Sequence, residues 1–502
     1  MAHTTSGIFY TLPAIMRETA RRKSNFTAFS TVGQDDDITY AQAVAKIDAI
    51  IFFLEQHGIK PGDKVAILST NMPNWGLTYF AIASMGAIAV PLLPDFSAEE
   101  IKNTLEHSES KAIFVSKSLR PKLQTLAVPT LLYQFGIEDF ADVNGNAVTG
   151  FDPSKTPSQQ YVVEEDDLAA IIYTSGTTGG SKGVMLSHKN IVFNAEKAGV
   201  VQPIKDTDRF LSILPLSHTY ENTLGLILPV MYGAHVFYIT KPPTPSVLLP
   251  ALQKVRPTIM LTVPLIIEKI YKAKIRPMVT QNSFIQHLYA IGPIRRTLNI
   301  VIGKKLKKTF GGKLKFFGIG GAKLDGVVEQ FLLEAKFPYA IGYGLTETSP
   351  LSAGVSPKTT RWQSTGPAIE GGEVKIHQAD PNTGEGEIWI RGPHVMQGYY
   401  KNPEKTAEVL TPDGWFRTGD LGKLSEDNYL YIKGRLKNMI LGSGGENIYP
   451  EEIEAIINNF NHVMESVVVE QKGKLIAMVH FNQQELEDKY QYLKSEVSDY
   501  IE

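Results

Sequence analysis

The sequence predicts an α/β protein: a large N-terminal domain of mostly parallel sheets covered by helices, with a small β-subdomain, and then a small α+β C-terminal domain. Three observations predict this class. Short β-rich runs alternate with longer amphipathic runs through the N-terminal half, glycine-rich alternating segments follow from Gly371, and a short module begins after Arg435. The chain has 502 residues, too many for one compact domain of the usual size.

The first alternation lies between residues 64 and 118. KVAILST (64–70) and AIAVPLL (87–93) predict two strands, with a helix between them from Trp75 to Met85. The segment 97–109 has helical spacing and a serine start, and it leads into a predicted strand at 111–118. Such β–α–β order predicts parallel strands covered by helices.

A second series begins at a predicted strand, LAAIIYTS (168–175), followed by a glycine-rich turn and a helix beginning near Ser187. Polar residues interrupt the apolar stretch 210–239, which therefore predicts buried strand and helix instead of a membrane span. Alternating EVKIH and EIWIRG segments predict the small β-subdomain within 371–398. The C-terminal module has a predicted helix at 450–460 and predicted strands at 465–471 and 474–481.

Composition narrows the classes of function. Hydrophobic residues make up 43% and charged residues 20%, which is typical of a globular protein with a large core. The net charge of −2 provides no global field for nucleic acid, so no nucleic-acid partner is expected. The chain has no cysteine, which excludes disulfides, thiolate metal sites and a cysteine nucleophile. The N-terminus lacks the pattern of a secretory signal, and we expect a cytoplasmic protein.

The most informative segment is YTSGTTGGSKGVMLSHKN (173–190), in which hydroxyl residues and glycines surround Lys182. Glycines let backbone N–H groups converge on an anion, and hydroxyls add further donors. The segment differs from the P-loop pattern, because Gly183 follows the lysine in place of Ser or Thr. A flexible linker is disfavoured between a buried strand and an amphipathic helix. The pattern predicts a phosphate-binding turn.

At this turn the chain resembles the adenylate-forming superfamily of acyl-CoA synthetases, luciferases, aryl-CoA ligases and adenylation domains. The family turn usually reads T-S-G-T-T-G-x-P-K-G, and here Gly180-Ser181 replaces x-Pro. Further segments match in the family's order: PLSHTYENT (215–223), GGA (320–322), GYGLTETSP (342–350), TGD (418–420) and GRLKNMI (434–440).

The resemblance implies the site residues. The expected ATP- and AMP-binding residues are Thr174, Ser175, Gly176, Thr177, Thr178, Gly179, Lys182, Gly321, Ala322, Tyr343, Gly344, Thr346, Asp420 and Arg435. Among them Tyr343 would stack on adenine, Thr346 would bond the α-phosphate, and Asp420 would take the ribose hydroxyls with support from Arg435. The expected catalytic residues are Lys182, Thr346, Glu347 and His218, and Glu347 would also hold Mg²⁺. A lone histidine such as His218 in an apolar stretch is also commonly structural.

The resemblance also implies a moving C-terminal domain. It places an ATP- and acyl-binding domain at 1–434, a hinge at 435–437 centred on Lys437, and the C-terminal domain at 438–502. The glycine-rich SGGEN would present Ser443, Gly444 and Gly445 to the pantetheine arm of coenzyme A.

One family feature is missing. The usual lysine in P-x-x-x-x-G-K has no counterpart after Lys437, where 65 residues remain. The available lysines (Lys472, Lys474, Lys489 and Lys494) lack that context. We therefore expect an incomplete C-terminal domain, from a truncation, and a chain that binds ATP and acyl chain but adenylates poorly.

The substrate class rests on two features. First, the segment GGKLKFFGIGGAKL (311–324) resembles that of long-chain fatty acyl-CoA synthetases most. Second, basic residues cluster from Arg295 to Lys308. Such a cluster is typical either of a solvated face or of a helix at a membrane surface, which would give peripheral contact through 295–315 at the inner face of the membrane. The leading hypothesis is a long-chain fatty acid–CoA ligase with Mg²⁺ as cofactor and ATP and coenzyme A as co-substrates. An acyl-AMP ligase loading a carrier protein, an aryl-acid ligase, and a non-catalytic nucleotide- or acyl-binding protein are the alternatives. Acyl chain length and oligomeric state stay open.

Overall fold

The computed structural model describes residues 11–124, 126–145, 149–174, 182–280, 282–441, 447–460, 462–471, 474–481 and 486. Contacts divide the chain into two compact units. Unit 1 comprises Met1–Val374 and Ile390–Phe416, and unit 2 comprises Lys375–Trp389 and Arg417–Glu502. The two units are described separately.

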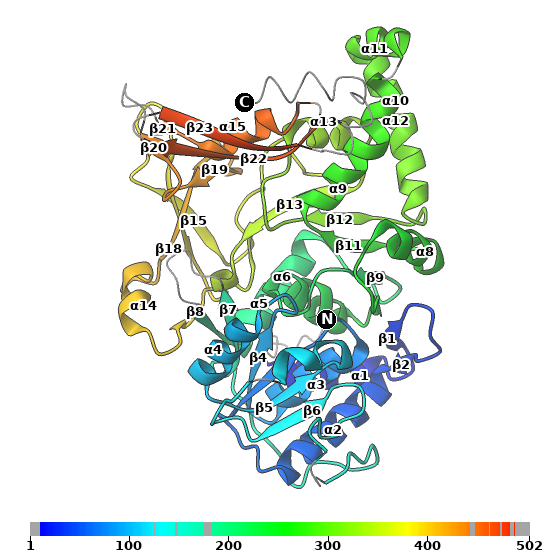
Figure 1. Ribbon diagram of the computed structural model, residues 1–502, viewed down its shortest axis with the longest axis vertical. Coiled ribbons are helices and arrows are strands. Elements are labelled where there is room, and N and C mark those ends of the chain that lie inside the picture. Colours follow the sequence, from blue (N-terminus) through cyan, green and yellow to red (C-terminus); the bar gives the residue numbers. More distant parts are fainter. Residues whose placement is uncertain are drawn as a thin grey trace, which may run out of the picture. The chain divides into compact units, whose positions relative to one another are not determined.

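Unit 1 is built on two large sheets (Figure 1). The seven-stranded sheet has the order β17 (Gly398–Tyr399), β8 (Lys182–Ser187), β7 (Leu168–Thr174), β4 (Ile88–Leu92), β3 (Lys64–Leu68), β5 (Ser110–Val115) and β6 (Tyr133–Gly136). Strands β7 to β6 are parallel, whereas β8 and β17 join antiparallel at one edge.

The eight-stranded sheet has the order β14 (Leu351–Gly354), β13 (Tyr339–Gly344), β12 (Phe316–Ile319), β11 (Ile259–Thr262), β9 (Arg209–Ser212), β10 (His235–Tyr238), β1 (Thr27–Thr31) and β2 (Ile38–Thr39). The six inner strands are parallel and each edge strand is antiparallel. The carboxyl ends of the inner strands therefore share one edge.

Helices cover both sheets, as expected for parallel strands that are buried on two faces. The α-helices of unit 1 are α1 (Leu12–Arg22), α2 (Tyr40–Gln56), α3 (Pro73–Ser84), α4 (Ala98–Ser108), α5 (His188–Val201), α6 (Thr219–Glu221), α7 (Leu228–Tyr232), α8 (Pro245–Val255), α9 (Pro264–Ile270), α10 (Arg276–Thr280), α11 (Ser283–Ala290), α12 (Gly292–Thr309), α13 (Gly326–Glu334) and α14 (Pro403–Val409). Two π-helical segments, η2 (Asn222–Ile227) and η3 (Tyr271–Ile275), and two 3₁₀ segments, η1 (Lys117–Leu123) and η4 (Thr346–Thr348), complete the list.

Consecutive residues of one strand pack in different hydrophobic cores. In β7, Ile172 packs in the largest core, which joins the inner faces of both sheets through α1, α2, α3, α5 and α7, while Ile171 packs on the opposite face near α4. In β11, Leu261 likewise belongs to the largest core, and Met260 belongs to the core beneath α8, α12 and α13. This alternation follows from the two-residue period of a strand.

Unit 2 carries most of a four-stranded sheet in the order β15 (Glu373–His377), β16 (Gly386–Arg391), β18 (Phe416–Leu424) and β19 (Leu430–Arg435). A few residues at the ends of β15, β16 and β18 are assigned to unit 1. It also contains the hairpin β20 (Ile440–Leu441) and β21 (Asn447–Ile448), helix α15 (Pro450–Ile457) and the hairpin β22 (Val463–Gln471) and β23 (Lys474–Phe481). Tyr449 bonds Glu385 through its hydroxyl at 2.8 Å, which ties α15 to the four-stranded sheet.

The structure confirms the predicted α/β class. The strands and helices expected from the sequence are present, and Ser97 and Ser187 cap α4 and α5 through capping boxes. The helix expected near Ser187 begins at His188, and KGVMLS, for which the sequence made no prediction, forms β8 before it and pairs along the length of β7. No helix within the described parts of the chain has the length and apolarity of a membrane span. The contacts divide the chain at Phe416, before Arg435, and the hinge and boundaries of 1–434, 435–437 and 438–502 stay predictions.

Candidate nucleotide and acyl site

The carboxyl edge of the eight-stranded sheet gathers several of the predicted site residues of unit 1. Gly321 and Ala322 follow β12, and Tyr343 and Gly344 end the neighbouring parallel strand β13. His218 follows β9, two strands further along the sheet. In open α/β sheets, ligands bind at this edge of the strands.

The predicted phosphate turn is held at both ends by paired strands. Thr174 at the end of β7 lies opposite Lys182 at the start of β8. Gly183 has no room for a side chain, because a Cβ atom there would lie 2.8 Å from Cγ2 of Ile171. The predicted residues Ser175, Gly176, Thr177, Thr178 and Gly179 lie outside the described part of the chain.

Tyr399 connects the two charged residues expected to handle phosphate and metal. Its hydroxyl donates to Oε1 of Glu347 at 2.8 Å, and the ammonium of Lys182 lies 5.2 Å from the centre of its ring. Tyr399 reaches this position because β17 pairs antiparallel with β8 beside the turn. Burial and the Glu347 carboxylate raise the pKa of Tyr399, so the phenol stays a hydrogen-bond donor at neutral pH. A cation and an anion from distant parts of the sequence thus share one aromatic side chain.

A tight turn between β13 and β14 presents Glu347. Gly344 must be glycine, since a Cβ atom there would lie 1.7 Å from the carbonyl oxygen of Pro350. The Thr348 hydroxyl accepts from Leu345 N at 3.0 Å and donates to Pro350 O at 2.6 Å. Thr346 and Glu347 occupy the short 3₁₀ segment inside this turn.

Two asparagines of α5 support the turn and the segment that carries Tyr399. Asn194 is fully buried and donates to the carbonyls of Thr348 and Leu351, while its Oδ1 accepts from Leu351 N. Asn190 donates to the carbonyls of Pro393 and Val395. The helix that follows the phosphate hairpin therefore supports both the turn that carries Glu347 and the segment that leads to Tyr399.

An apolar cavity of about 50 Å³ extends inward from this edge, between α5, η2 and strands β11 to β14. Phe210, Leu224, Leu261 and Ile341 are among its lining residues. Gly342 also lines it, one residue before Tyr343. A hydrocarbon-lined space thus adjoins the polar edge where the nucleotide is expected.

His218 lies at the N-terminal end of α6, beside the cavity residue Tyr220. Its side chain is exposed, yet enough protein surrounds the ring to lower its pKa, which favours the neutral imidazole. Three residues further on, Glu221 is buried, and burial raises the pKa of its carboxyl to about 8, so this group is mostly protonated at pH 7. At neutral pH neither side chain is mainly in its charged form.

In unit 2 the structure brings together Asp420 and Arg435, which lie opposite each other on β18 and β19. Arg435 Nε lies 3.0 Å from Oδ1 of Asp420. Lys437 is exposed in the turn that follows. The residues predicted for coenzyme A, Ser443, Gly444 and Gly445, lie outside the described residues.

The residues present fit a magnesium ion that arrives with a nucleotide. No group of three or more acidic or histidine side chains within the described residues could hold a metal by itself. Mg²⁺ on ATP usually takes only one or two protein carboxylates, with phosphate oxygens and water completing the shell. Glu347, with one oxygen held by Tyr399, meets that need.

Sequence reasoning missed Tyr399, Asn190 and Asn194. Asn190 had a signal in the S-x-x-N spacing of the helix start, where it completes the capping box of α5. The pairing of β17 with β8, which brings Tyr399 in, joins segments about two hundred residues apart and has no local signal.

Comparison with known proteins gives concordant results. Residues 16–400 match the model of a family described as AMP-binding enzyme. The long-chain-fatty-acid–CoA ligase FadD15 of Mycobacterium bovis is 30% identical over 86% of this chain and 75% of its own length. The long-chain-fatty-acid–CoA ligase heimdall of Drosophila melanogaster is 28% identical over 89% of this chain and 72% of its own. Among solved structures, ATP-bound MatB from Rhodopseudomonas palustris matches with a TM-score of 0.77 and 26% identity, covering 95% of this chain and 89% of that one.

Proposed function

Because the chain belongs to the family of AMP-binding enzymes, we propose that it joins a long-chain fatty acid to coenzyme A in two steps. In the first step a carboxylate oxygen of the fatty acid attacks the α-phosphorus of ATP, and pyrophosphate leaves. In the second step the thiol sulfur of coenzyme A attacks the acyl carbon, and AMP leaves with the bonding electrons while the thiol proton passes to solvent. The reaction class is that of the AMP-forming acid–thiol ligases.

The first step must overcome repulsion between two anions. Two unit charges about 4 Å apart repel by roughly 4 kcal/mol at an effective dielectric near 20. In the proposed arrangement Lys182 neutralises phosphate charge, Thr346 bonds the α-phosphate, and Glu347 binds the Mg²⁺ that accompanies ATP. The ion, when bound, supplies further neutralisation of the phosphate oxygens. The attacking carboxylate is already an anion, so the step needs no general base.

The proposed nucleotide contacts beyond phosphate follow the predicted roles. Tyr343 stacks on adenine, with Gly321, Ala322 and Gly344 lining the same edge. Asp420 accepts the ribose hydroxyls, and Arg435, whose Nε lies 3.0 Å from Oδ1 of Asp420, supports the same carboxylate. A carboxylate that accepts two hydroxyl donors is a common solution for binding ribose.

The observation that carries the choice of a fatty acid is the apolar cavity that Gly342 helps to line, one residue before the predicted adenine residue Tyr343. Burial of hydrocarbon favours a long chain by about 0.8 kcal/mol for each methylene that leaves water. The lining is almost wholly apolar, so a polar acyl group would lose its contacts with water there without gaining hydrogen-bond partners. The names of the curated relatives FadD15 and heimdall agree with this choice.

An ATP–pyrophosphate exchange assay with acetate, octanoate, palmitate and benzoate tests the first step. We expect exchange to require Mg²⁺ and to be fastest with a long-chain acid, at a low overall rate because no lysine in the P-x-x-x-x-G-K context follows Lys437 in this sequence. Exchange with benzoate alone would contradict the fatty-acid assignment. Thioester formation, measured with coenzyme A and separately with an acyl carrier protein, then distinguishes a coenzyme A ligase from an acyl-AMP ligase.

A further inference from the structure

The charge of the chain is distributed unevenly. Between Glu268 and Asp325 there is no acidic residue, although the whole chain has 52. The same segment contains thirteen of the 50 Lys and Arg residues. In a protein of net charge −2, this segment is therefore a local concentration of positive charge.

Part of this charge is used inside the fold. Arg295 pairs with the buried carboxylate of Glu334 on α13 at 2.8 Å, and Asn299 donates to the same carboxylate. Lys315 pairs with Asp208 at 2.8 Å. The contacts with Glu334 fix α12 in place, and because Arg295 and Lys315 are both paired we exclude them from the docking surface considered below.

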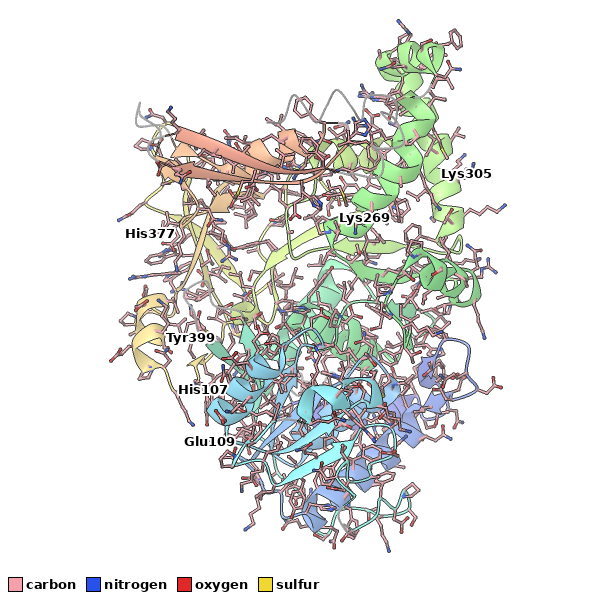
Figure 2. All side chains as sticks on the ribbon, viewed as in Figure 1. His107, Glu109, Lys269, Lys305, His377 and Tyr399 are labelled. Atoms are coloured by element: carbon pink, nitrogen blue, oxygen red, sulfur yellow. The ribbon has the colours of Figure 1, made fainter. Side chains whose placement is uncertain are left out.

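Four other basic residues of α12 are exposed. The exposed residues of this helix include Arg296, Val301, Lys304, Lys305 and Lys308, which at 100° per residue lie on one half of the helix surface. The opposite face is buried through Asn299, Gly303 and Leu306. Lys305 projects outward from the helix (Figure 2). Among the residues that the structure describes, no carboxylate pairs with these four basic side chains.

Exposed apolar side chains accompany the basic face. Helix α11, which lies at the end of α12 away from the sheets, buries none of its residues (Figure 1). Phe284 is 69% exposed, Ile291 at the junction of the two helices is 50% exposed, and Val301 on the basic face is 61% exposed. A single exposed apolar residue is ordinary, but three on one basic helical hairpin resemble the mixed surface that binds a lipid interface.

We propose that the hairpin of α11 and α12 docks on an anionic lipid surface. The hairpin surface consists of Arg296, Lys304, Lys305 and Lys308 with Phe284, Ile291 and Val301. The basic side chains bind lipid phosphates, and the apolar ones enter the boundary between headgroups and acyl chains. Nucleic acid would match the charge and leave the apolar residues without a role. Docking deepens the proposed function by placing the enzyme where fatty acids partition, but the contact with lipid does not depend on ligase activity.

Co-sedimentation with vesicles of phosphatidylcholine, with and without one-third phosphatidylglycerol, tests the proposal on the full chain. Each basic residue near such a surface contributes about fivefold to partitioning. The triple variant Lys304→Gln, Lys305→Gln, Lys308→Gln should therefore bind the anionic vesicles about a hundredfold more weakly. The matched control Lys60→Gln, Lys205→Gln, Lys358→Gln removes the same charge from other exposed positions and should stay within about threefold of the wild type.

A second variant, Phe284→Ser with Val301→Ser, tests the apolar contribution. It should weaken vesicle binding at high salt, where screening removes the electrostatic attraction, and leave the binding of DNA unchanged. Equal loss for the two lysine variants, or DNA binding as tight as vesicle binding with no effect of the serine variant, would overturn the proposal. All variants should retain the wild-type melting temperature, because the altered side chains are exposed. ATP–pyrophosphate exchange in lipid-free solution should be unchanged in the lysine variants, so docking and ligase activity can fail independently.

Discussion

Asn194 gives the strongest test of how the fold positions Glu347. Its side chain is fully buried and makes three hydrogen bonds to the turn between β13 and β14: to Thr348 O at 3.1 Å, to Leu351 O at 2.7 Å, and from Leu351 N at 3.2 Å. Substitution Asn194→Ala removes all three. Asn194→Asp keeps the acceptor but directs a carboxylate at two carbonyl oxygens, and it should be the more harmful change.

The expected magnitudes follow from these bonds. At about 1 kcal/mol for each bond, Asn194→Ala should destabilise the fold by about 3 kcal/mol. A shift of about 1 Å in the turn would misplace Glu347 and cost about a hundredfold in the rate of adenylation. Affinity for ATP should weaken in the presence of Mg²⁺, because Glu347 is the proposed metal ligand.

Isothermal titration with ATP and Mg²⁺, pyrophosphate exchange and thermal melting measure these effects. The control is Asn74→Ala, which also removes two hydrogen bonds to carbonyls, those of Ile137 and Glu138, at a distance from the turn. The control should lower stability and leave ATP affinity unchanged. If Asn194→Ala lowers stability but leaves ATP affinity and exchange rate within about twofold of the wild type, Asn194 does not position the site.

Three further predictions concern single side chains. Tyr399→Phe keeps the ring beside Lys182 and removes the 2.8 Å bond to Glu347, so ATP affinity should fall about three- to tenfold with Mg²⁺ and stay unchanged without it; equal losses in both buffers would contradict this reasoning. Ala198→Leu places a larger side chain from α5 into the cavity. Excluding two methylenes of the acyl chain should reduce kcat/KM for palmitate about fifteenfold relative to octanoate. The control Val200→Leu, at an exposed position on the same helix, should not change that ratio. Glu221→Gln tests a pH dependence, because burial raises the pKa of this carboxyl to about 8 in the folded protein from an ordinary value of 4.5. Between pH 4.5 and pH 8 the folded state keeps a proton that the unfolded state loses, so the stability of the wild type falls as the pH rises through this range. Urea midpoints should favour the variant increasingly from pH 5 to pH 8 and then level off, and a constant difference would refute the assignment.

The sequence predicted most of the fold because its signals are local. Ser97 and Ser187 stand before helical spacing, and both cap their helices. The run LAAIIYTS is apolar throughout, as expected for a strand buried on two faces, and it forms β7. KGVMLS was overlooked as a strand because its glycine and its position after a turn obscure a short β8 that depends on pairing with β7.

The candidate site was predicted as a set of residues but not as a set of contacts. The motif order placed Lys182, Glu347, Gly321 and Tyr343 in one site, and the parallel strands bring the last three to one sheet edge. The link from Lys182 to Glu347 runs through Tyr399, which depends on a long-range strand pairing. Such pairings follow from the packing of the whole unit and leave no period or spacing in the sequence.

The most direct test of the central claim is a crystal structure of the chain with Mg²⁺ and a non-hydrolysable ATP analogue. The account predicts the phosphates at Nζ of Lys182, the metal within about 2.1 Å of a Glu347 oxygen, and the ribose hydroxyls at Asp420. A nucleotide bound elsewhere, or a triphosphate that contacts neither Lys182 nor Glu347, would contradict it.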